Sequence, residues 1–364
     1  MTTKINVLHV IHSLYGGGAE TQLRILCQTG IEHNIDSTTF CIDGGRDDLI
    51  ENRKVISYQR KSKLDFGIYK AIKSAIKEVD ADIVHAWLPP VVTVPAVIAA
   101  KISGVPVITS YRSAKEIRSF KDIVEYMVCL SASSGIASNT PVELCSFPYQ
   151  WLHNIKHGVV IPNAVIIPEQ MQCKNIQSEA GDDLFKILFV GRISSEKNWE
   201  CLIRAVGKIR NGLPWRLTIC GKGPDEKQLL EEIKRYRLEE KIQVLGFRDN
   251  IYKVMKSHDV LVLPSWYEGV PNVLFEAFAV GLPAIISDIP SHKNIVAGHD
   301  VALTFPPDSP DSLCSKLEQL GGDINLRSQL SENACEFVKD FEPVKMAKAY
   351  KQYYAQLVDS CTIK

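Results

Sequence analysis

This sequence lacks a net charge and a regular spacing of cysteines, and both absences limit the functions that it could have. Lys plus Arg and Asp plus Glu both number 42, so the 364-residue chain has no net charge that would indicate nucleic acid as its main partner. Its 10 cysteines form no C-x-x-C pair and no regular spacing. Several lie in apolar surroundings, as buried free thiols do, which fits a reducing cytoplasm: Cys27, Cys41, Cys129 and Cys220.

The sequence also lacks an uninterrupted apolar run of membrane-spanning length. The most apolar stretch, residues 83–100, is broken by three prolines and by His85, which predicts a buried strand followed by a proline-started helix. The first 18 residues lack the apolar core and small-residue cleavage site of a signal peptide. We therefore expect a cytoplasmic protein, either free or peripheral on the inner face of the plasma membrane.

Strand-like and helix-like segments alternate along most of the chain. The first series ends in "GVVIPNAV", a polar stretch at 166–183 reads as a linker, and a second series opens with "FKILFVGRI". Alternation of this kind predicts parallel sheets covered by helices on both faces. We expect one Rossmann-like domain over 1–164, a second over 165–341, and a last helix over 342–364 that packs back on the first domain.

Four segments of the second domain are expected at the carboxyl edge of its sheet, where open α/β sheets bind ligands. "GRISSEK" supplies Arg192 and Lys197, a cation pair that suits a diphosphate. "CGKG" supplies Gly221 for close backbone approach. "LGFRDN" is either a loop that places Phe247 or Arg248 near a nucleobase or a plain turn, and the sequence leaves both open. Neither "CGKG" nor "GGGAE" has the third glycine of a dinucleotide fingerprint, which disfavours a nicotinamide enzyme.

The fourth segment, "SWYEGVPNVLFEAFAVGLP" at 265–283, carries two acids around a helix start. Pro271 fits the first helical position, so the next three residues are expected to present free N–H groups to an anion. Glu276 suits a vicinal diol such as ribose, and Glu268 suits hydroxyls of a sugar. Dipole compensation would explain Glu276 alone and says nothing of Glu268.

These motifs, in this order, closely resemble the retaining GT-B glycosyltransferases often called family 4, which carry two glutamates separated by seven residues. "GGGAE", "DIVHAW" and "VIPNAV" extend the resemblance over most of the chain. It implies two facing Rossmann-like domains with a cleft between them and a nucleotide-sugar as co-substrate, with no other cofactor. The residues expected to bind the donor are Gly17, Gly18, Arg192, Lys197, Gly221, Phe247, Arg248, Gly269, Val270, Pro271, Asn272, Val273, Leu274 and Glu276.

The sequence departs from the family pattern on the acceptor side. Arg112 stands where many members have a histidine near the reacting sugar, and Trp87 replaces a second histidine. His85 is therefore either catalytic or a core histidine, and the sequence leaves both open. Ala164 follows the junction asparagine where a glycine is usual. The expected catalytic set is Glu268, Arg192, Lys197, His85 and Arg112.

Two charge patterns have ordinary explanations beside a functional one. Asp80 and Asp82 form a D-x-D at the turn from a helix into a strand, where capping explains them, so no metal is predicted. Residues 53–77 carry eight basic residues against Asp65. A solvated helix face is the default reading; the alternative is docking to an anionic membrane, with residues 115–128 as an apolar face.

The sequence thus predicts a metal-independent retaining glycosyltransferase that uses a nucleotide-sugar, preferably UDP-linked. The expected acceptor is a glycan, lipid-linked and of bacterial surface polysaccharide or lipopolysaccharide synthesis. Two alternatives remain: a nucleotide-sugar epimerase of the same architecture, and a non-catalytic nucleotide-sugar-binding subunit. A soluble acceptor is a further alternative within the transferases.

Overall fold

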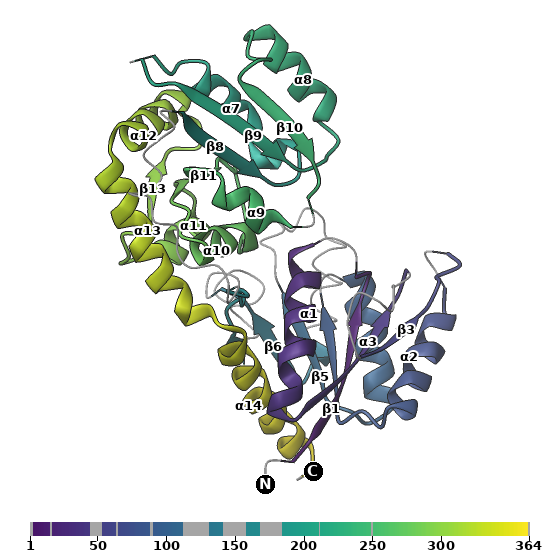
Figure 1. Ribbon diagram of the computed structural model, residues 1–364. Coiled ribbons are helices and arrows are strands. Elements are labelled where there is room, and N and C mark those ends of the chain that lie inside the picture. Colours follow the sequence, from purple (N-terminus) through teal and green to yellow (C-terminus); the bar gives the residue numbers. More distant parts are fainter. Residues whose placement is uncertain are drawn as a thin grey trace. The chain divides into compact units, whose positions relative to one another are not determined.

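A computed structural model describes residues 3–14, 17–43, 53–62, 65–87, 90–111, 131–140, 158–167, 184–210, 212–248 and 250–362. The chain divides into two compact units, which are treated separately (Figure 1). Unit 1 comprises Met1–Ala164 and Phe341–Lys364, and unit 2 comprises Val165–Asp340. The chain passes from unit 1 to unit 2 at Val165 and returns to unit 1 at Phe341, so the last helix, α14 (Pro343–Thr362), belongs to unit 1.

Unit 1 is built on a seven-stranded parallel sheet with the order β3-β2-β1-β4-β5-β6-β7. The order reverses direction between β1 and β4, as in doubly wound Rossmann-like sheets. The strands are β1 (Ile5–Ile11), β2 (Ile35–Cys41), β3 (Lys54–Ser57), β4 (Ile83–Trp87), β5 (Val107–Tyr111), β6 (Gly135–Ser138) and β7 (Gly158–Val160).

Helices cover both faces of this sheet, because alternate strand residues point to opposite sides. From β1, Val7 and Ile11 pack with α1 and α14, whereas Leu8 and Val10 pack with α2 and α3 (Figure 1). The helices are α1 (Gly18–Thr29), the short 3-10 turn η1 (Gly30–His33), α2 (Gly67–Glu78), α3 (Pro90–Ile102) and α14.

Unit 2 repeats the plan with a six-stranded parallel sheet ordered β10-β9-β8-β11-β12-β13. Its strands are β8 (Phe185–Val190), β9 (Trp215–Cys220), β10 (Ile242–Gly246), β11 (Val260–Leu263), β12 (Ala284–Ser287) and β13 (Ala302–Phe305). The helical segments are η4 (Ser195–Lys197), α7 (Trp199–Val206), α8 (Glu226–Arg235), α9 (Ile251–Lys256), α10 (Asn272–Ala279), α11 (Pro290–Val296), α12 (Pro310–Gly322) and α13 (Ile324–Val338), with η5 (Lys339–Phe341) at the boundary of the two units.

The predicted α/β class with two Rossmann-like halves is confirmed. The apolar stretch at 83–100 is strand β4 followed by helix α3, which begins at Pro90 as expected. Among the described residues, no helix is both long and apolar enough to span a bilayer. Cys27, Cys41 and Cys220 are buried free thiols, as predicted, whereas Cys129 lies outside the described residues.

Candidate functional site

Two loops meet at the point where the strand order of unit 2 reverses. β8 and β11 are neighbours in the sheet, and the chain leaves them in opposite directions. Open α/β sheets bind ligands at the carboxyl ends of two such strands. The loop after β8 carries Lys197 and the loop after β11 carries Glu268. The Lys197 Nζ lies 2.5 Å from the Glu268 Oε1, and their side chains are only 23% and 10% exposed. The sequence predicted both residues here, and the structure brings them into direct contact.

Hydrogen bonds to backbone carbonyls hold these two loops together. The Asn198 amide donates to the carbonyls of Pro264, at 2.9 Å, and Pro307, at 2.7 Å. The Trp266 N–H donates to the Glu196 carbonyl at 3.0 Å. Asn198 has a left-handed backbone with φ 52°, a conformation that asparagine adopts more readily than most residues. This bend directs its side chain onto the Glu268 loop directly after Lys197.

Glu268 has a second partner besides Lys197. The Ser265 hydroxyl donates to the Glu268 Oε1 at 2.7 Å, and the Ser265 carbonyl accepts from the Ser287 hydroxyl at 2.6 Å. Ser265 and Ser287 lie at the carboxyl ends of β11 and β12, which are paired strands. Sequence reasoning missed both serines, although their position at or just after a buried strand is a usable signal.

Glycines let a neighbouring loop approach the cation loop. A Cβ on Gly221 would lie 1.8 Å from the Gly191 carbonyl oxygen, and one on Gly223 would lie 1.9 Å from that of Ile193. Hydrogen bonds join the same segments, because the Ile193 N–H donates to the Lys222 carbonyl at 3.1 Å. Gly221 was predicted as a ligand contact; the structure shows that it permits close packing of two backbone loops.

Arg192, the other predicted cation, is exposed one residue beyond Gly191. Burial acts to raise the pKa of Glu196, but hydrogen bonds and the charges of Arg192 and Lys197 outweigh it and lower that pKa. The two cations therefore act on the same short loop. Their joint field favours an anion at this edge of the sheet.

Helix α10 corrects one prediction. Pro271 is the N-cap, and the helix begins at Asn272, one residue later than expected. The Leu274 N–H donates to the Pro271 carbonyl at 3.0 Å, so it is not free for a ligand, contrary to the prediction. The cause is the extended backbone of Pro271, with ψ 106°, which turns its carbonyl back toward the first turn. Val273 is half-buried in this first turn, as are Gly269 and Val270 in the preceding loop.

Glu276, on α10, is a half-buried acid. Burial raises its pKa to about 7, so it exchanges its proton near neutral pH. Burial also raises the pKa of Tyr252 on α9, and the nearby Glu276 carboxylate adds to that effect. A partly desolvated carboxylate is a strong acceptor for hydroxyl groups, which is the chemistry expected of Glu276.

The loop after β10 carries the two residues predicted near a base. The Phe247 side chain is 61% exposed, and Arg248 is exposed as well. Burial raises the pKa of Cys220, at the end of β9, and the charge of Arg248 opposes this rise. Arg248 therefore lies close enough to the carboxyl edge of the sheet to act on it, and Phe247 offers an uncovered aromatic ring beside it.

Three residues of unit 1, besides His85, were predicted to belong to the site. Gly17 is the N-cap of α1 and Gly18 is its first residue. The Glu20 carboxylate folds back over Gly17, because a Cβ there would lie 2.1 Å from the Glu20 Oε2. Arg112 lies outside the described residues.

His85 is a core histidine, which corrects its inclusion among the expected catalytic residues. It is fully buried in β4, and both ring nitrogens are hydrogen-bonded. Its Nδ1 lies 2.7 Å from the Tyr354 hydroxyl on α14, and its Nε2 lies 2.5 Å from the Ser110 Oγ on β5. The ring also stacks on Trp87 at 4.5 Å. His85 fastens the last helix to the sheet and has no face open to a substrate.

The D-x-D was predicted to act in capping, and the structure shows instead that both residues contact Asn6 of β1. The Asp82 Oδ2 accepts from the Asn6 N–H at 2.7 Å, and the Asp80 carbonyl accepts from the Asn6 amide at 3.1 Å. The pair therefore fixes the start of β1 beside β4. Within the described part of the chain, no cluster of three His, Cys, Asp or Glu residues could hold a metal ion.

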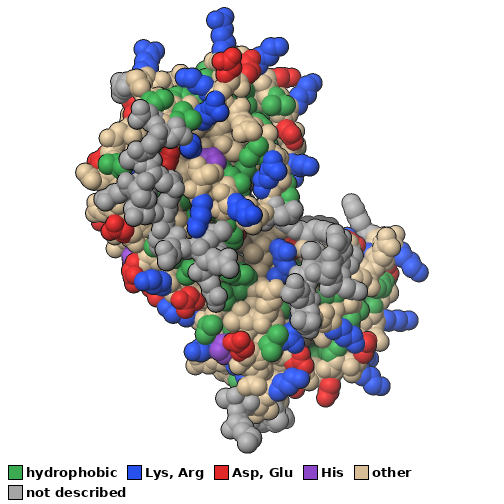
Figure 2. Space-filling model, in the orientation of Figure 1, with side chains coloured by type: hydrophobic (Ala, Val, Ile, Leu, Met, Phe, Trp, Pro, Cys, Tyr) green, Lys and Arg blue, Asp and Glu red, His purple; other side chains and the backbone are tan. Residues whose placement is uncertain are grey.

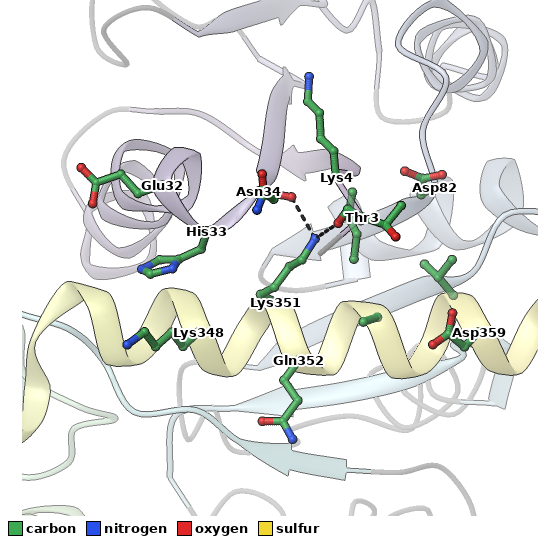
Figure 3. Close-up of a pocket in the computed structure, with 13 residues that line it drawn as sticks. Thr3, Lys4, Glu32, His33, Asn34, Asp82, Lys348, Lys351, Gln352 and Asp359 are labelled. Atoms are coloured by element: carbon green, nitrogen blue, oxygen red, sulfur yellow. Dashed lines mark hydrogen bonds between the residues drawn. The ribbon is translucent and has the colours of Figure 1, made fainter. Parts of the chain in front are cut away.

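A cavity of about 530 Å³ lies in unit 1, at the edge of the sheet where the strands begin (Figure 3). It is lined by the residues before β1 and β4 and by α14, from which Lys351 reaches the carbonyls of Thr3 and Asn34. Open α/β sheets bind ligands at the carboxyl ends of their strands, and this cavity lies at the amino ends. Lys351 instead anchors α14 to the sheet.

Comparison with known proteins shows which family part of the chain resembles. Residues 173–337 match the model for the glycosyl transferases group 1. The N-acetylgalactosamine-N,N'-diacetylbacillosaminyl-diphospho-undecaprenol 4-alpha-N-acetylgalactosaminyltransferase of Campylobacter jejuni is 33% identical over 195 residues, 53% of this chain and 52% of that protein. This chain thus spans about half of the length of the first curated relatives that it matches.

A second protein of Campylobacter jejuni, a GalNAc-alpha-(1->4)-GalNAc-alpha-(1->3)-diNAcBac-PP-undecaprenol alpha-1,4-N-acetyl-D-galactosaminyltransferase, is 26% identical over 93% of this chain and 95% of its own. Among solved structures, HepE of Anabaena in complex with UDP and glucose has a TM-score of 0.81 at 18% identity, over 97% of this chain and 99% of that one. This likeness gives the fold, which is GT-B. Over residues 173–337, less than half of its length, the chain resembles the group 1 glycosyl transferases.

Proposed function

We propose that this protein transfers a sugar from a nucleotide-sugar to a glycan acceptor, with retention of anomeric configuration. The observation that carries the proposal is the contact of Lys197 with Glu268 at the switch point of the unit 2 sheet. The group 1 glycosyl transferase match covers this same region.

The chemistry assigned to the site is the departure of a diphosphate. Lys197 has three N–H donors, of which one serves Glu268, so the others remain for phosphate oxygens. Arg192 and the first turn of α10 add positive potential to the same edge. These groups stabilise the charge that develops on the leaving oxygen. The departing phosphate itself takes the acceptor proton in this scheme.

The two glutamates divide the recognition of the donor. Glu268 faces the cation and accepts from hydroxyls of the transferred sugar, while Glu276 accepts from the ribose hydroxyls. Phe247 and Arg248 lie against the base. We propose a UDP-linked donor because a protein with the same fold has been solved with UDP. The acceptor we propose is a lipid-linked glycan, since the names of two relatives describe undecaprenol-linked substrates.

A screen of UDP- and GDP-sugars for thermal stabilisation tests the donor, because a ligand that binds the folded protein raises the melting temperature. A UDP-sugar is expected to stabilise the protein and to be consumed only with acceptor, giving a product with the donor's anomeric configuration by NMR. Conversion of donor without acceptor would indicate an epimerase. Binding without turnover of any acceptor would indicate a binding subunit, and either result would overturn the proposal.

We further propose that unit 1 docks on anionic lipid, through a smaller surface than the sequence suggested. Within residues 53–77, Arg53 pairs with Asp36, Lys54 with Glu78 and Arg60 with Asp43, so acids neutralise part of the basic segment. Residues 115–128, the proposed apolar face, lie outside the described residues, as does Lys63.

The three lysines of α2 support this docking. Lys70, Lys73 and Lys77 are exposed and line a groove of about 570 Å³. Cationic side chains project from this part of unit 1 with acidic side chains between them (Figure 2), and Asp80 lines the same groove.

Charge reversal tests the lysine surface. Each cation near an anionic surface contributes about 1 kcal/mol, so changing all three lysines to Glu should reduce binding to phosphatidylglycerol vesicles at low salt by about 100-fold or more. Lys208, Lys227 and Lys234 of unit 2 are exposed, so their change to Glu is a control of equal charge. An equal loss of vesicle binding in both triple variants, or no binding by the wild type, would contradict docking through these lysines.

A further inference from the structure

A buried histidine lies behind the Lys197–Glu268 pair. His292 is in the first turn of α11, directly after β12, and it is fully buried. Its Nδ1 lies 2.9 Å from the Ser287 carbonyl oxygen and 3.2 Å from the Ser287 Oγ. Ser287 in turn donates to the Ser265 carbonyl, and Ser265 donates to Glu268. The sequence gave no reason to single out this histidine.

The contacts decide where the proton of His292 lies. A carbonyl oxygen only accepts, so the Nδ1 carries the hydrogen that it shares with Ser287. The Ser287 hydroxyl spends its own hydrogen on the Ser265 carbonyl, so toward the ring it can only accept. The Nε2 is buried and has no hydrogen-bond partner among the residues that the structure describes. Burial lowers the pKa of His292, so the ring is neutral.

We propose that His292 is a positioning residue for donor-sugar recognition, which fixes Glu268 through Ser287 and Ser265. The ring holds Ser287, the Ser287 hydroxyl holds the Ser265 backbone, and the Ser265 hydroxyl fixes which oxygen of Glu268 faces Lys197. This inference rests on the proposed role of Glu268 as the acceptor for sugar hydroxyls. His292 itself touches no ligand, because its side chain is covered.

A neutral ring matters for this arrangement. The Glu268 charge acts to raise the pKa of His292 and the Lys197 charge acts to lower it, so the ring lies within electrostatic range of both. A second cation there would compete with Lys197 for the carboxylate. A neutral His292 orients Glu268 through Ser287 and Ser265. It leaves the charge of the carboxylate to interact with Lys197 and with the sugar.

Replacements of His292 separate its two nitrogens. The amide nitrogen of Asn reproduces the Nδ1 donor, whereas Leu removes it. His258 is the matched control, because it is a buried histidine of the same unit whose nitrogens contact the Val254 carbonyl and the Thr218 Oγ1. It precedes the amino end of β11, whereas Ser265 and Glu268 follow the carboxyl end of that strand. The variants are therefore His292→Asn, His292→Leu and His258→Leu, with Glu268→Gln as the reference for loss of the carboxylate.

The first readout is calorimetric binding of UDP and of the UDP-sugar selected by the thermal screen. UDP lacks the sugar, so loss of Glu268 orientation should spare it. We expect His292→Leu to weaken the UDP-sugar by about the factor seen for Glu268→Gln, on the order of 10-fold, with UDP affinity changed less than 2-fold. His292→Asn should restore the affinity and His258→Leu should keep it. Equal weakening of both ligands, or no rescue by Asn, would overturn the proposal.

The second readout needs no ligand, so it stands if the protein binds no nucleotide-sugar and the proposed function fails. The melting temperatures of His292→Leu, Glu268→Gln and the double variant form a cycle. If His292 acts through Glu268, the melting temperature of the double variant should fall by less than the sum of the two single shifts. The shifts of His258→Leu and Glu268→Gln should instead sum in their double variant. Full additivity with His292→Leu would show that the histidine is only a part of the core, and would overturn the positioning role.

Discussion

Replacement of Glu276 by Gln should change stability and ligand affinity in opposite directions. Burial raises the pKa of this acid from 4.5 to about 7 in the folded protein. A difference of that size corresponds to up to about 3 kcal/mol, since one pKa unit is about 1.4 kcal/mol. The carboxylate is the form that burial disfavours. The wild type therefore carries this cost at high pH, where Glu276 is ionised in both the folded and the unfolded chain.

The sign follows from proton binding. Below pH 4.5 both states are protonated and the cost is absent. Between pH 4.5 and about 7 the unfolded chain has lost this proton while the folded chain keeps it, so the wild type loses stability as the pH rises. Glu276→Gln does not titrate, so it should melt at a higher temperature than the wild type at pH 8, by up to about 6–12 °C, and at a similar temperature at pH 4.

The assay is differential scanning fluorimetry of both proteins from pH 4 to pH 8, with UDP titrations at pH 8. The same change should weaken UDP, because a neutral amide accepts ribose hydroxyls less strongly than a carboxylate does. Glu240→Gln, at an exposed position of the same unit, is the control and should show neither effect. A stability difference that does not change with pH, or a Gln variant that is less stable at pH 8, would refute the reasoning.

Two further substitutions test the packing around the site and the core of unit 1. Gly223→Ala should destabilise unit 2 by several kcal/mol, about 3 or more, because its Cβ would meet the Ile193 carbonyl, whereas Gly322→Ala, which has open space, should melt like the wild type in thermal denaturation. His85→Leu leaves two buried hydroxyls without their partner, so it should lower the stability by about 2–4 kcal/mol while UDP affinity is kept; lost activity at unchanged stability would restore a catalytic role.

The fold could be predicted because its elements follow simple periodicities. The apolar side chains of α1 and α2 recur at helical spacing, and those of β4 and β11 form short buried runs that follow an aspartate and end shortly before a proline. The meeting of Lys197 and Glu268 could be expected too, because both follow strands of one parallel sheet. The edge at which such strands end is common to all of them.

The parts that could not be predicted depend on side chains that are distant in the sequence. Nothing near His85 shows that Tyr354 and Ser110 would take both of its nitrogens. The acids that neutralise Arg53 and Lys54 come from β2 and the end of α2, and a count along the chain misses these pairs. The buried chain from His292 to Glu268 likewise depends on the register of β11 and β12, which residue spacing does not reveal.

Calorimetric titration of UDP into the wild type and into Lys197→Met tests most directly whether a diphosphate binds at the carboxyl edge of unit 2. Lys197 supplies the ammonium closest to Glu268, and a charge-assisted contact of this kind is worth about 1.5–3 kcal/mol. We predict that the wild type binds UDP and that the variant binds it roughly 10- to 100-fold more weakly. No binding by the wild type, or equal affinity in the two proteins, would contradict the account.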